Sequence, residues 1–394
     1  SYDKESGELV LHNYMDFDDL KDYVKISYEL TQDGLVISKG ILPEFSVAPH
    51  SEGKTNLQAN VPENGKCYLK LTYHLKKEMP LLEEDYILGF DEIEVSQKDA
   101  KCQLAEKWVE KTVTDSELQV SEDDTQIHIK GREFAYTIDR RTALFTEMKF
   151  AGREYLNHPM ELNIWRAPTD NDMYIKSEWK KAHYDKAYTR AYTTEVVQGK
   201  HGVKITSHAS VVAETVQKIL DVTITWKIEA AGKIDADIAV TKDDEFPDLP
   251  RFGVRMFLDK NLSAARYFGM GPQESYCDKH QAASHGLYQA NVDDLHEDYI
   301  RPQENGSHYD CEYVELNNSR YGIVVSAENA FSFNASYYTQ EELEKKTHNY
   351  ELKESDSVVF CVDYALNGIG SNSCGPVVLE QYRFDDVLFR FQFT

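Results

Sequence analysis

The stretch CYLKLTYHL at Cys67–Leu75 places Cys, Leu, Leu, Tyr and Leu on one side of a period-two pattern and Tyr, Lys, Thr and His on the other. Alternation of this kind is typical of a β-strand with one buried face. Upstream, VKISYEL at Val24–Leu30 repeats the pattern, and Asp33-Gly34 and Asn64-Gly65 supply turn residues beside these segments. The beginning of the chain is therefore predicted to consist of short strands joined by tight turns.

Residues 1–97 contain several such segments, whose length and spacing favour an immunoglobulin-like β-sandwich. Charged residues then dominate and the alternation is lost, which indicates a linker at residues 98–120. Two domains also fit the length of 394 residues, since single hydrophobic cores stop growing near roughly 250–300 residues.

The second domain, residues 121–394, is predicted to be mostly β as well. Apolar and polar residues alternate again in segments such as Leu220–Ile228 and Arg251–Leu258. Two exceptions are expected. Residues 172–190 are rich in Lys, Ala and aromatics without Gly or Pro and predict a helix, and TQEE from Thr339 is a capping box that opens a short helix through His348. The fold class is all-β.

Charge and composition exclude several functions. The chain has 43 Lys and Arg against 68 Asp and Glu, a net charge of -25, so its field repels nucleic acid. No apolar run approaches the roughly 18–20 residues that cross a bilayer, and no membrane contact is expected. The 6 cysteines are scattered without a CxxC pair, which favours a reducing, cytoplasmic location.

The densest polar cluster is WRAPTDND, which runs from Trp165 to Asp172. One interpretation is a loop whose carboxylates, Asp170 and Asp172, meet a sugar, a cation or the Arg of a partner. The other is local, because Asp170, Asn171 or Asp172 can cap the predicted helix. The residues alone leave both interpretations open.

Two further turn-rich segments carry glutamates. GMGPQESY contains Glu274 and PQENG contains Glu304, and tight turns are the simplest interpretation of both segments. A glycosidase pair of carboxylates needs a defined separation that a sequence does not provide, so these two glutamates remain a weak alternative. A Gly-rich segment at Asn367–Pro376 is either a plain connection between strands or a loop that approaches a ligand.

The residue patterns of common catalytic centres are missing from the sequence. It has no HExxH, no pair of histidines at i and i+4, and no GxSxG. No metal site and no nucleophile elbow are therefore predicted in this chain.

Taken together, these segments resemble the C-terminal portion of the β-galactosidases of glycoside hydrolase family two. The resemblance rests on WRAPTDND from Trp165, GMGPQESY from Gly269, PQENG from Pro302, and GIG with SCGP between Gly368 and Pro376. All four occur in the family's order. The first domain is similar to the sandwich that follows the family's barrel, through Leu11-His12-Asn13 and Ala48-Pro49 among others.

The resemblance implies that the second domain is a large antiparallel supersandwich similar to galactose mutarotases. It also implies that the catalytic barrel, with its acid/base and nucleophile glutamates and most of the Mg and Na ligands, precedes this portion, so that no catalytic residue lies in this chain. The turn around Gly152 looks like a loop that borders the family's active site. Cys374 stands near a position where some members carry a Trp that stacks on substrate.

The function implied by the resemblance is that of a non-catalytic part of a retaining β-galactosidase acting on β-galactosides such as lactose. The expected partners are the N-terminal and barrel domains, the galactoside and further copies in a homo-oligomer. The residues expected next to substrate are Gly152, Arg166, Asp170, Asn171, Asp172 and Cys374. The alternatives are a stand-alone carbohydrate-binding module and a mutarotase-like epimerase.

Overall fold

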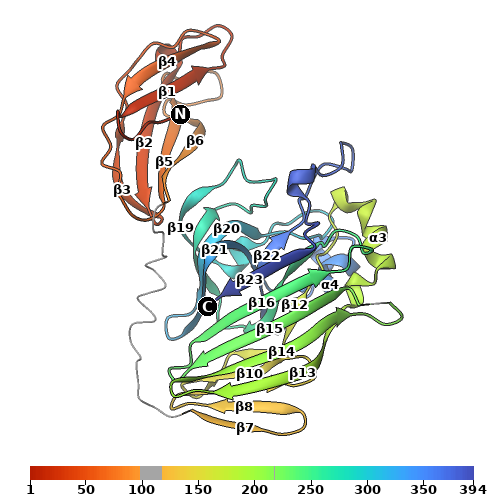
Figure 1. Ribbon diagram of the computed structural model, residues 1–394. Coiled ribbons are helices and arrows are strands. Elements are labelled where there is room, and N and C mark those ends of the chain that lie inside the picture. The colour runs from red at the N-terminus through yellow and green to blue at the C-terminus, as the bar shows by residue number, and fades with distance from the viewer. Residues whose placement is uncertain (98–117, 217) are drawn as a thin grey trace. The chain divides into compact units, whose positions relative to one another are not determined.

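The computed structural model describes residues 1–97, 118–216 and 218–394. These residues form two compact units, one of residues 1–97 with the short segment Ser284–Leu287, the other of the remaining described residues (Figure 1). The predicted linker 98–120 lies almost entirely outside the described residues. Its last two residues, Gln119 and Val120, pair with Lys130 and Ile129 as the start of a strand of the second unit.

The first unit is a sandwich of two antiparallel sheets. One sheet pairs β1 (Glu8–Asn13) with β4 (Ser51–Asn56), and the other has the order β3-β2-β5-β6. The bounds of its remaining elements are α1 (Leu20–Tyr23), β2 (Val24–Gln32), β3 (Leu35–Ile41), β5 (Cys67–Leu75) and β6 (Ile87–Ser96). Leu9, Leu11, Ile26, Leu69 and Leu71 meet in the core between the sheets. The period-two prediction for β2 and β5 is confirmed.

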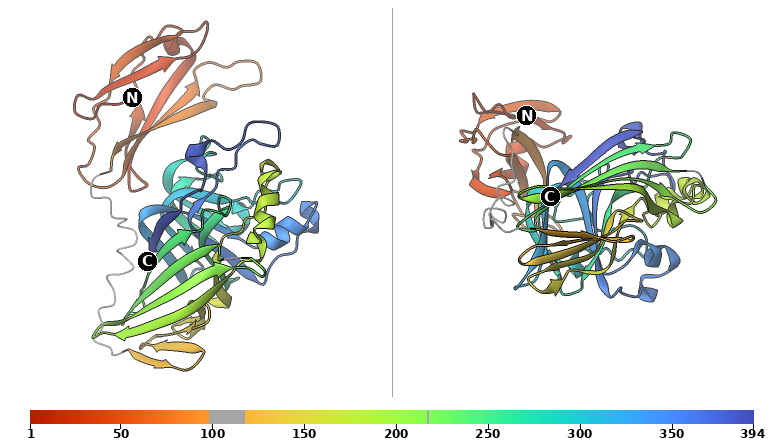
Figure 2. Two further views of the ribbon diagram at one scale, coloured as in Figure 1. Left: turned by 45° about the vertical axis from the view of Figure 1, so that its right-hand side comes forward. Right: turned by 60° about the horizontal axis from the view of Figure 1, so that its bottom comes forward.

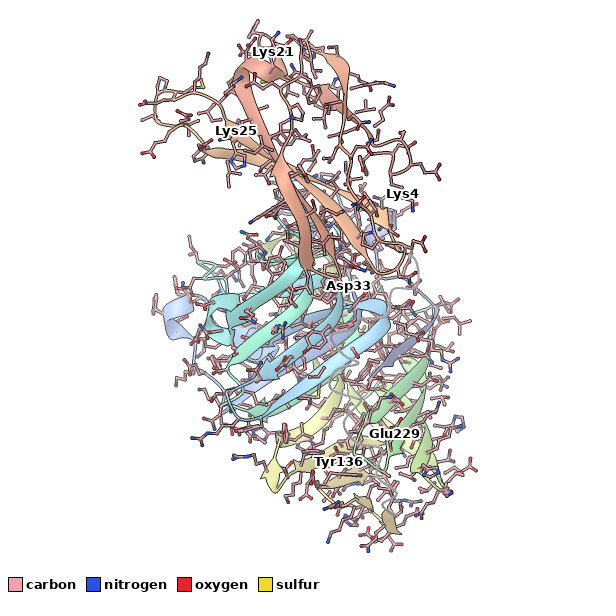
Figure 3. The ribbon with its side chains drawn as sticks, turned by 90° about the vertical axis from the view of Figure 1, so that its left-hand side faces the viewer. Lys4, Lys21, Lys25, Asp33, Tyr136 and Glu229 are labelled. Atoms are coloured by element: carbon pink, nitrogen blue, oxygen red, sulfur yellow. The ribbon has the colours of Figure 1, made fainter. Side chains whose placement is uncertain are left out.

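The turn between β2 and β3 has the predicted chemistry. Asp33 and Gly34 have φ of 48° and 80°, and both values fall in the left-handed region that a two-residue hairpin turn requires. The Asp33 carboxylate, at the position labelled in Figure 3, accepts a hydrogen bond of 2.9 Å from the Lys66 amide. This bond joins the β2–β3 turn to the chain that enters β5.

The second unit contains three sheets, and their layers are seen in Figures 1 and 2. The first sheet has the order β11-β10-β9-β8-β7, with β7 (Gln119–Glu122), β8 (Gln126–Lys130), β9 (Phe134–Asp139), β10 (Leu144–Phe150) and β11 (Arg153–Glu154). The second has the order β13-β14-β15-β16-β23, with β13 (Tyr188–Gln198), β14 (Gly202–Val212), β15 (Leu220–Glu229), β16 (Ile234–Lys242) and β23 (Leu388–Phe393).

The third and largest sheet has seven strands in the order β12-β17-β22-β21-β20-β18-β19. Their bounds are β12 (Leu156–Asn163), β17 (Arg251–Asp259), β18 (Ala264–Gly271), β19 (Ser284–Asn291), β20 (Ser307–Asn317), β21 (Gly322–Ser336) and β22 (Ser357–Leu366). Asn163 pairs with Gly253, and Gly253 pairs with Asp363. The last residues of β12, the first residues of β17 and the last residues of β22 are therefore neighbours at one end of these strands.

Aromatic side chains fill the core of the second unit. Phe145 packs edge-on against Trp226 and Tyr136, with ring centroids 4.9 and 6.0 Å away. The polar atoms of these rings are satisfied, since Trp226 Nε1 donates to the Ala143 carbonyl at 2.8 Å. The hydroxyl of Tyr136, which is labelled in Figure 3, donates to the Gly232 carbonyl at 2.8 Å. Long β-strands around such a core confirm the all-β prediction.

The predicted helix at 172–190 is too long. The structure has a 3-10 turn at Asp170–Asp172, helix α3 at Ile175–Lys181, a second 3-10 turn at Tyr184–Lys186 and then β13. His183 takes a left-handed φ of 58°, which interrupts the helical hydrogen bonding. The sequence after it, YTRAYTT, is rich in aromatic and β-branched residues, and these favour a strand.

The second predicted helix is confirmed at its start. Thr339 caps α4 (Gln340–Lys345), and its hydroxyl accepts a hydrogen bond of 3.1 Å from the Glu342 amide. The helix ends at Lys345 rather than His348, because Lys346 is extended. No helix in the described part of the chain is long and apolar enough to cross a membrane.

Candidate functional site

The segments singled out in the sequence meet around Arg166, which follows β12 and is fully buried. Its guanidinium forms a two-point contact with Asp172, through Nε to Oδ2 at 3.1 Å and Nη2 to Oδ1 at 2.7 Å. The remaining donors reach the carbonyl oxygens of Asn367 and Gly368, the latter at 3.1 Å. Arg166 therefore ties the segment that follows β12 to the Gly-rich segment that follows β22.

Asp172 has a structural role that combines a cap with a buried ion pair. Its Oδ2 accepts the Thr169 amide at 2.9 Å and the Thr169 hydroxyl at 3.2 Å, and Thr169 and Asp172 form a capping box around the 3-10 turn. Burial opposes the charge of Arg166, but Asp172 offsets that effect, and the pKa of Arg166 is raised. For Asp172, the interpretation as a capping residue therefore holds, although the turn that it caps is the 3-10 turn.

Asn171 joins the same two segments on the surface side. Its amide Nδ2 donates to the Gly370 carbonyl at 2.7 Å, and its Oδ1 accepts the Ser373 hydroxyl at 2.7 Å and the Ser373 amide at 3.3 Å. Asp170 is exposed and is tied to Gln303, whose Oε1 accepts the Asp170 amide at 3.0 Å. The three predicted residues Asp170, Asn171 and Asp172 therefore each position a loop.

Asp278 completes the support of the Gly-rich segment. Its two carboxylate oxygens accept the amides of Ile369 and Gly370 at 2.9 and 2.7 Å. Consecutive peptide groups from Asn367 to Gly370 are thus held by an arginine, an aspartate and an asparagine. The sequence analysis did not identify Asp278, which lies just after the GMGPQESY segment.

A second buried arginine lies at the same end of these strands. Arg251, at the start of β17, contacts Asp363 of β22 through Nε–Oδ1 at 3.1 Å and Nη2–Oδ2 at 2.5 Å, and Glu304 Oε1 through Nη1 at 2.9 Å. Burial raises the pKa of Glu304, and its Oε2 has no hydrogen-bond partner among the described residues. Sequence analysis missed Arg251 and Asp363. The available signal was Asp363, a lone charge inside the otherwise apolar strand β22, whereas Arg251 begins a strand that also contains Arg255.

The structure argues against Glu274 and Glu304 as a catalytic pair. Glu304 is fully buried and bound to Arg251. Glu274 Oε2 accepts the Gly306 amide at 2.8 Å, while Oε1 binds Lys279 and the Tyr299 hydroxyl. Glu304 is closed off by burial and by its ion pair with Arg251, and both oxygens of Glu274 are bound within the chain, so neither carboxylate is available to a glycosidic bond.

Cys374 lies on the exposed tip of the Gly-rich loop, one residue after Ser373. Two exposed apolar side chains, Val377 and Leu379, follow it on the same loop. We call Cys374, Val377 and Leu379 the rim surface. An exposed group of this kind is typical of a surface that meets another molecule or domain.

Gly152 lies away from the rim surface. It occupies the β10–β11 turn with φ of 78°, preceded by Ala151 with φ of 49°, and a Cβ there would meet nothing within 4 Å. Gly152 precedes β12, whereas Arg166 follows it, and eight strand residues at about 3.3 Å each separate the two by roughly 25 Å. The structure brings together the other five predicted residues but not Gly152.

The described residues also lack a metal centre of the usual composition. No group of three or more His, Cys, Asp or Glu among them is placed to hold a metal ion. Around the loops, Asp172, Asp278 and Glu304 each bind donors of the chain itself, and the Asp170 carboxylate contacts Gln303 Nε2 at 3.4 Å. These residues therefore do not fit the Mg and Na ions that the resemblance implies for the parent enzyme.

Comparisons with known proteins agree with this arrangement. A family model described as beta galactosidase small chain matches residues 130–394, and one described as beta-galactosidase, domain 4, matches residues 9–96. A β-galactosidase of Actinobacillus pleuropneumoniae is 42% identical over 98% of this chain, and one of Staphylococcus xylosus is 30% identical over 99%. The chain spans only 38% and 39% of the length of these two relatives.

Solved structures with a related arrangement include a galactose 1-epimerase from Lactobacillus acidophilus, at 8% identity and a TM-score of 0.34. That match covers 71% of this chain and 97% of the epimerase. An alpha-mannosidase from Enterococcus faecalis, at 7% identity and a TM-score of 0.37, is matched over 98% of this chain and 37% of its own.

A sandwich followed by a three-sheet β unit, with loops of the second unit fixed by buried arginines, defines an all-β protein of two units. The two family matches make this class specific: the chain belongs to the β-galactosidase family and is a C-terminal portion of such an enzyme, with domain 4 and the small-chain region. The resemblance identified from the sequence is thereby confirmed.

Proposed function

We propose that this chain completes the active-site rim of a retaining β-galactosidase that hydrolyses terminal β-galactosides such as lactose. The observation that carries the proposal is the loop from Asn367 to Gly370. Arg166, Asp278 and Asn171 hold its successive peptide groups, and its tip carries the exposed rim surface. Fixing a surface loop with buried charges is costly, and a preorganised substrate wall is a use for which such rigidity matters.

The chemistry of hydrolysis is assigned to the part of the enzyme outside this chain. The carboxylates around the rim are engaged with Arg166, Arg251, Lys279 or backbone amides, so they are not free to act as acid or nucleophile. The catalytic glutamates, together with Mg and Na, belong in this proposal to the N-terminal and barrel domains. The chain alone is then inactive.

In the assembled enzyme the rim surface faces the aglycone side of the pocket. Cys374 offers a small polarizable side chain where a Trp would offer a stacking face, so the sugar beyond the scissile bond is held with less contact area. The turn at Gly152 would contribute only if the barrel brings its own segment toward it, since it lies at the far end of β12. Homo-oligomer formation is part of the same proposal.

A cytoplasmic location is also proposed. Cys67, Cys277, Cys311, Cys361 and Cys374 are all unpaired in the described part of the chain. Unpaired thiols are typical of proteins that function in a reducing compartment. Equal activity with and without a reductant would be expected for such an enzyme.

The test is complementation between this chain and the separately expressed remainder of the enzyme. Each part alone is assayed for hydrolysis of lactose and of a nitrophenyl galactoside, and the two are then mixed. Activity in the mixture alone supports the proposal, and turnover by this chain alone contradicts it. A mixture that associates but gains no activity over the barrel part would show that the rim is dispensable for the chemistry.

A single substitution that loosens the loop, paired with a control elsewhere on the surface, tests its role in the mixture. Asn171→Ala removes the contacts to Gly370 and Ser373 without touching the buried Arg166–Asp172 pair. In the mixture, N171A should raise KM for lactose several-fold. Tyr188→Ala, an exposed aromatic on β13 away from the rim, should leave KM unchanged.

A further inference from the structure

A concave surface lies on the solvent face of the sheet β13-β14-β15-β16-β23, whose strands run side by side in Figure 1. It is a groove of about 570 Å³, within the range of about 300–1,000 Å³ that is usual for small-molecule sites. Its residues are distinct from the Arg166 cluster and from the rim surface.

The groove arises from the sizes of neighbouring side chains. The register places His208 opposite Thr223, Thr223 opposite Ala239, and Ala239 opposite Arg390. Small residues therefore form the floor, while larger ones form the two walls. A neighbouring row repeats the scheme, since Asp221 pairs with Thr241 and Thr241 pairs with Leu388.

An exposed aromatic ring stands on one wall. Tyr192 is 56% exposed and lies at a β-bulge of β13, where the register shifts between Ala191 and Thr193. Bulges of this kind redirect a side chain and are common next to functional sites. Arg190 lies with its Cζ 5.6 Å from the centroid of the Tyr192 ring, a cation–π contact that favours a fixed ring orientation.

The polar groups of the groove are neutralised within the chain. Arg390 forms a two-point ion pair with Asp237, and Asp221 forms a single-contact ion pair with Lys218, Nζ to Oδ2 at 2.5 Å. In a protein with a net charge of -25, these paired charges leave donors and acceptors in the groove without a strong local field of one sign. Such a surface suits a neutral ligand with many hydroxyl groups better than a phosphate or a charged peptide.

From this geometry we propose that the groove is an ancillary saccharide-binding site for neutral oligosaccharides. The Tyr192 ring stacks on the apolar face of a pyranose, and Thr223, Thr241 and the Asp221 carboxylate take up its hydroxyl groups. The floor at Ala239 leaves room for the ring. This inference depends on the groove alone and is independent of the proposed role of the rim.

The test is a binding titration of the whole chain with lactose and with a galactosyl-lactose trisaccharide at millimolar concentrations. Amide NMR shifts locate the binding surface, and calorimetry measures the affinity. We expect shifts at Thr223, Ala239 and Thr241, millimolar affinity, and clearly weaker binding of the anionic analogue lactobionate. An absence of binding, or binding that moves only the amides of the rim loop, would overturn the proposal.

Two variants and two controls sharpen the test. Tyr192→Ala removes the stacking face, and Ala239→Leu fills the floor. Each should weaken trisaccharide binding at least fivefold. Tyr188→Ala and Val197→Ala, which truncate exposed side chains of the same strand outside the groove, should bind like wild type.

The same variants separate this site from other uses of the groove. If the chain self-associates through this face, sedimentation of wild type will depend on concentration and Y192A will remain monomeric, with no saccharide effect on either. That result would overturn the saccharide proposal. Because the readout is binding rather than hydrolysis, loss of activity at the rim leaves the result interpretable.

Discussion

The substitution Asp172→Asn isolates the energetic role of the buried pair at the rim. The Arg166 side chain is 0% exposed and that of Asp172 is 2% exposed, so the guanidinium has no water to replace a lost carboxylate. Asp172 Oδ2 accepts three donors, from Arg166 Nε and from the Thr169 amide and hydroxyl. The asparagine oxygen will keep that position, and its NH₂ group will then face Arg166 Nη2 donor to donor.

Removing one partner of a buried ion pair costs about 3–5 kcal/mol of unfolding free energy, because the other charge remains buried and uncompensated. At roughly 2–4 °C per kcal/mol for a domain of this size, the melting temperature of the second unit should fall by about 6–20 °C. The assay is thermal unfolding of the whole chain, followed by calorimetry so that the transitions of the two units are resolved.

The control is the same substitution at Asp237, which also contacts an arginine, Arg390, at two points. The Arg390 side chain is 61% exposed, so water replaces the lost carboxylate and only a small change is expected. If D172N melts as close to wild type as D237N does, burial is not what gives the Arg166 pair its importance, and the reasoning is refuted.

Three further outcomes are expected. In the complemented enzyme, Asn171→Ala should raise KM for lactose several-fold with a melting temperature close to that of wild type, because its contacts are on the surface side of the loop. In a Cys102→Ser background, Cys374 should react first with a thiol reagent in the native state, and the buried thiols only after unfolding, as mass spectrometry of the labelled chain would show. Burial lowers the pKa of His308 from 6.5 to about 4, so the unfolded chain takes up a proton first as pH falls. The stability lost between pH 6.5 and 4 on this account is roughly 3 kcal/mol, and His308→Asn should flatten that part of the curve of unfolding free energy against pH.

The strands could be predicted from the sequence because their side chains alternate locally. At Cys67–Leu75 and Leu220–Glu229 one buried face is visible in the residue order itself. The helix at 172–190 was overextended because propensity does not register the left-handed conformation of His183 or the pairing of β13 with β14. The pairing of neighbouring strands therefore determines where a helix like this one ends.

The candidate site was predictable only in part. WRAPTDND and the Gly-rich segment were visible as polar clusters, and Asp172 and Arg166 are close in sequence. Arg251 and Asp363 are 112 residues apart, and neither stands in a recognisable motif. A contact between residues so far apart in sequence depends on which strands pair in the sheet, and the local residue pattern does not determine that pairing. Gly152 shows a different failure. It has the positive φ expected of a turn glycine, but it lies before β12, whereas the other predicted site residues that belong to the WRAPTDND segment follow β12.

The way the Gly-rich loop is held divides its residues into two classes. At its base, Arg166 binds the carbonyls of Asn367 and Gly368 and Asp278 binds the amides of Ile369 and Gly370. These partners contact only backbone atoms of the loop. Its path is therefore set independently of the side chains at the tip.

At the tip, Ser373 is bound to Asn171, whereas the Cys374 side chain is exposed. Substitution of Cys374 should therefore change which aglycone is favoured without changing stability. Substitution of Arg166 or Asp278 should damage both stability and activity, because it releases the backbone that presents the tip. The proposed function then predicts that Cys374→Trp in the complemented enzyme will lower KM for aromatic galactosides at an unchanged melting temperature, because the base of the loop is fixed through backbone atoms alone.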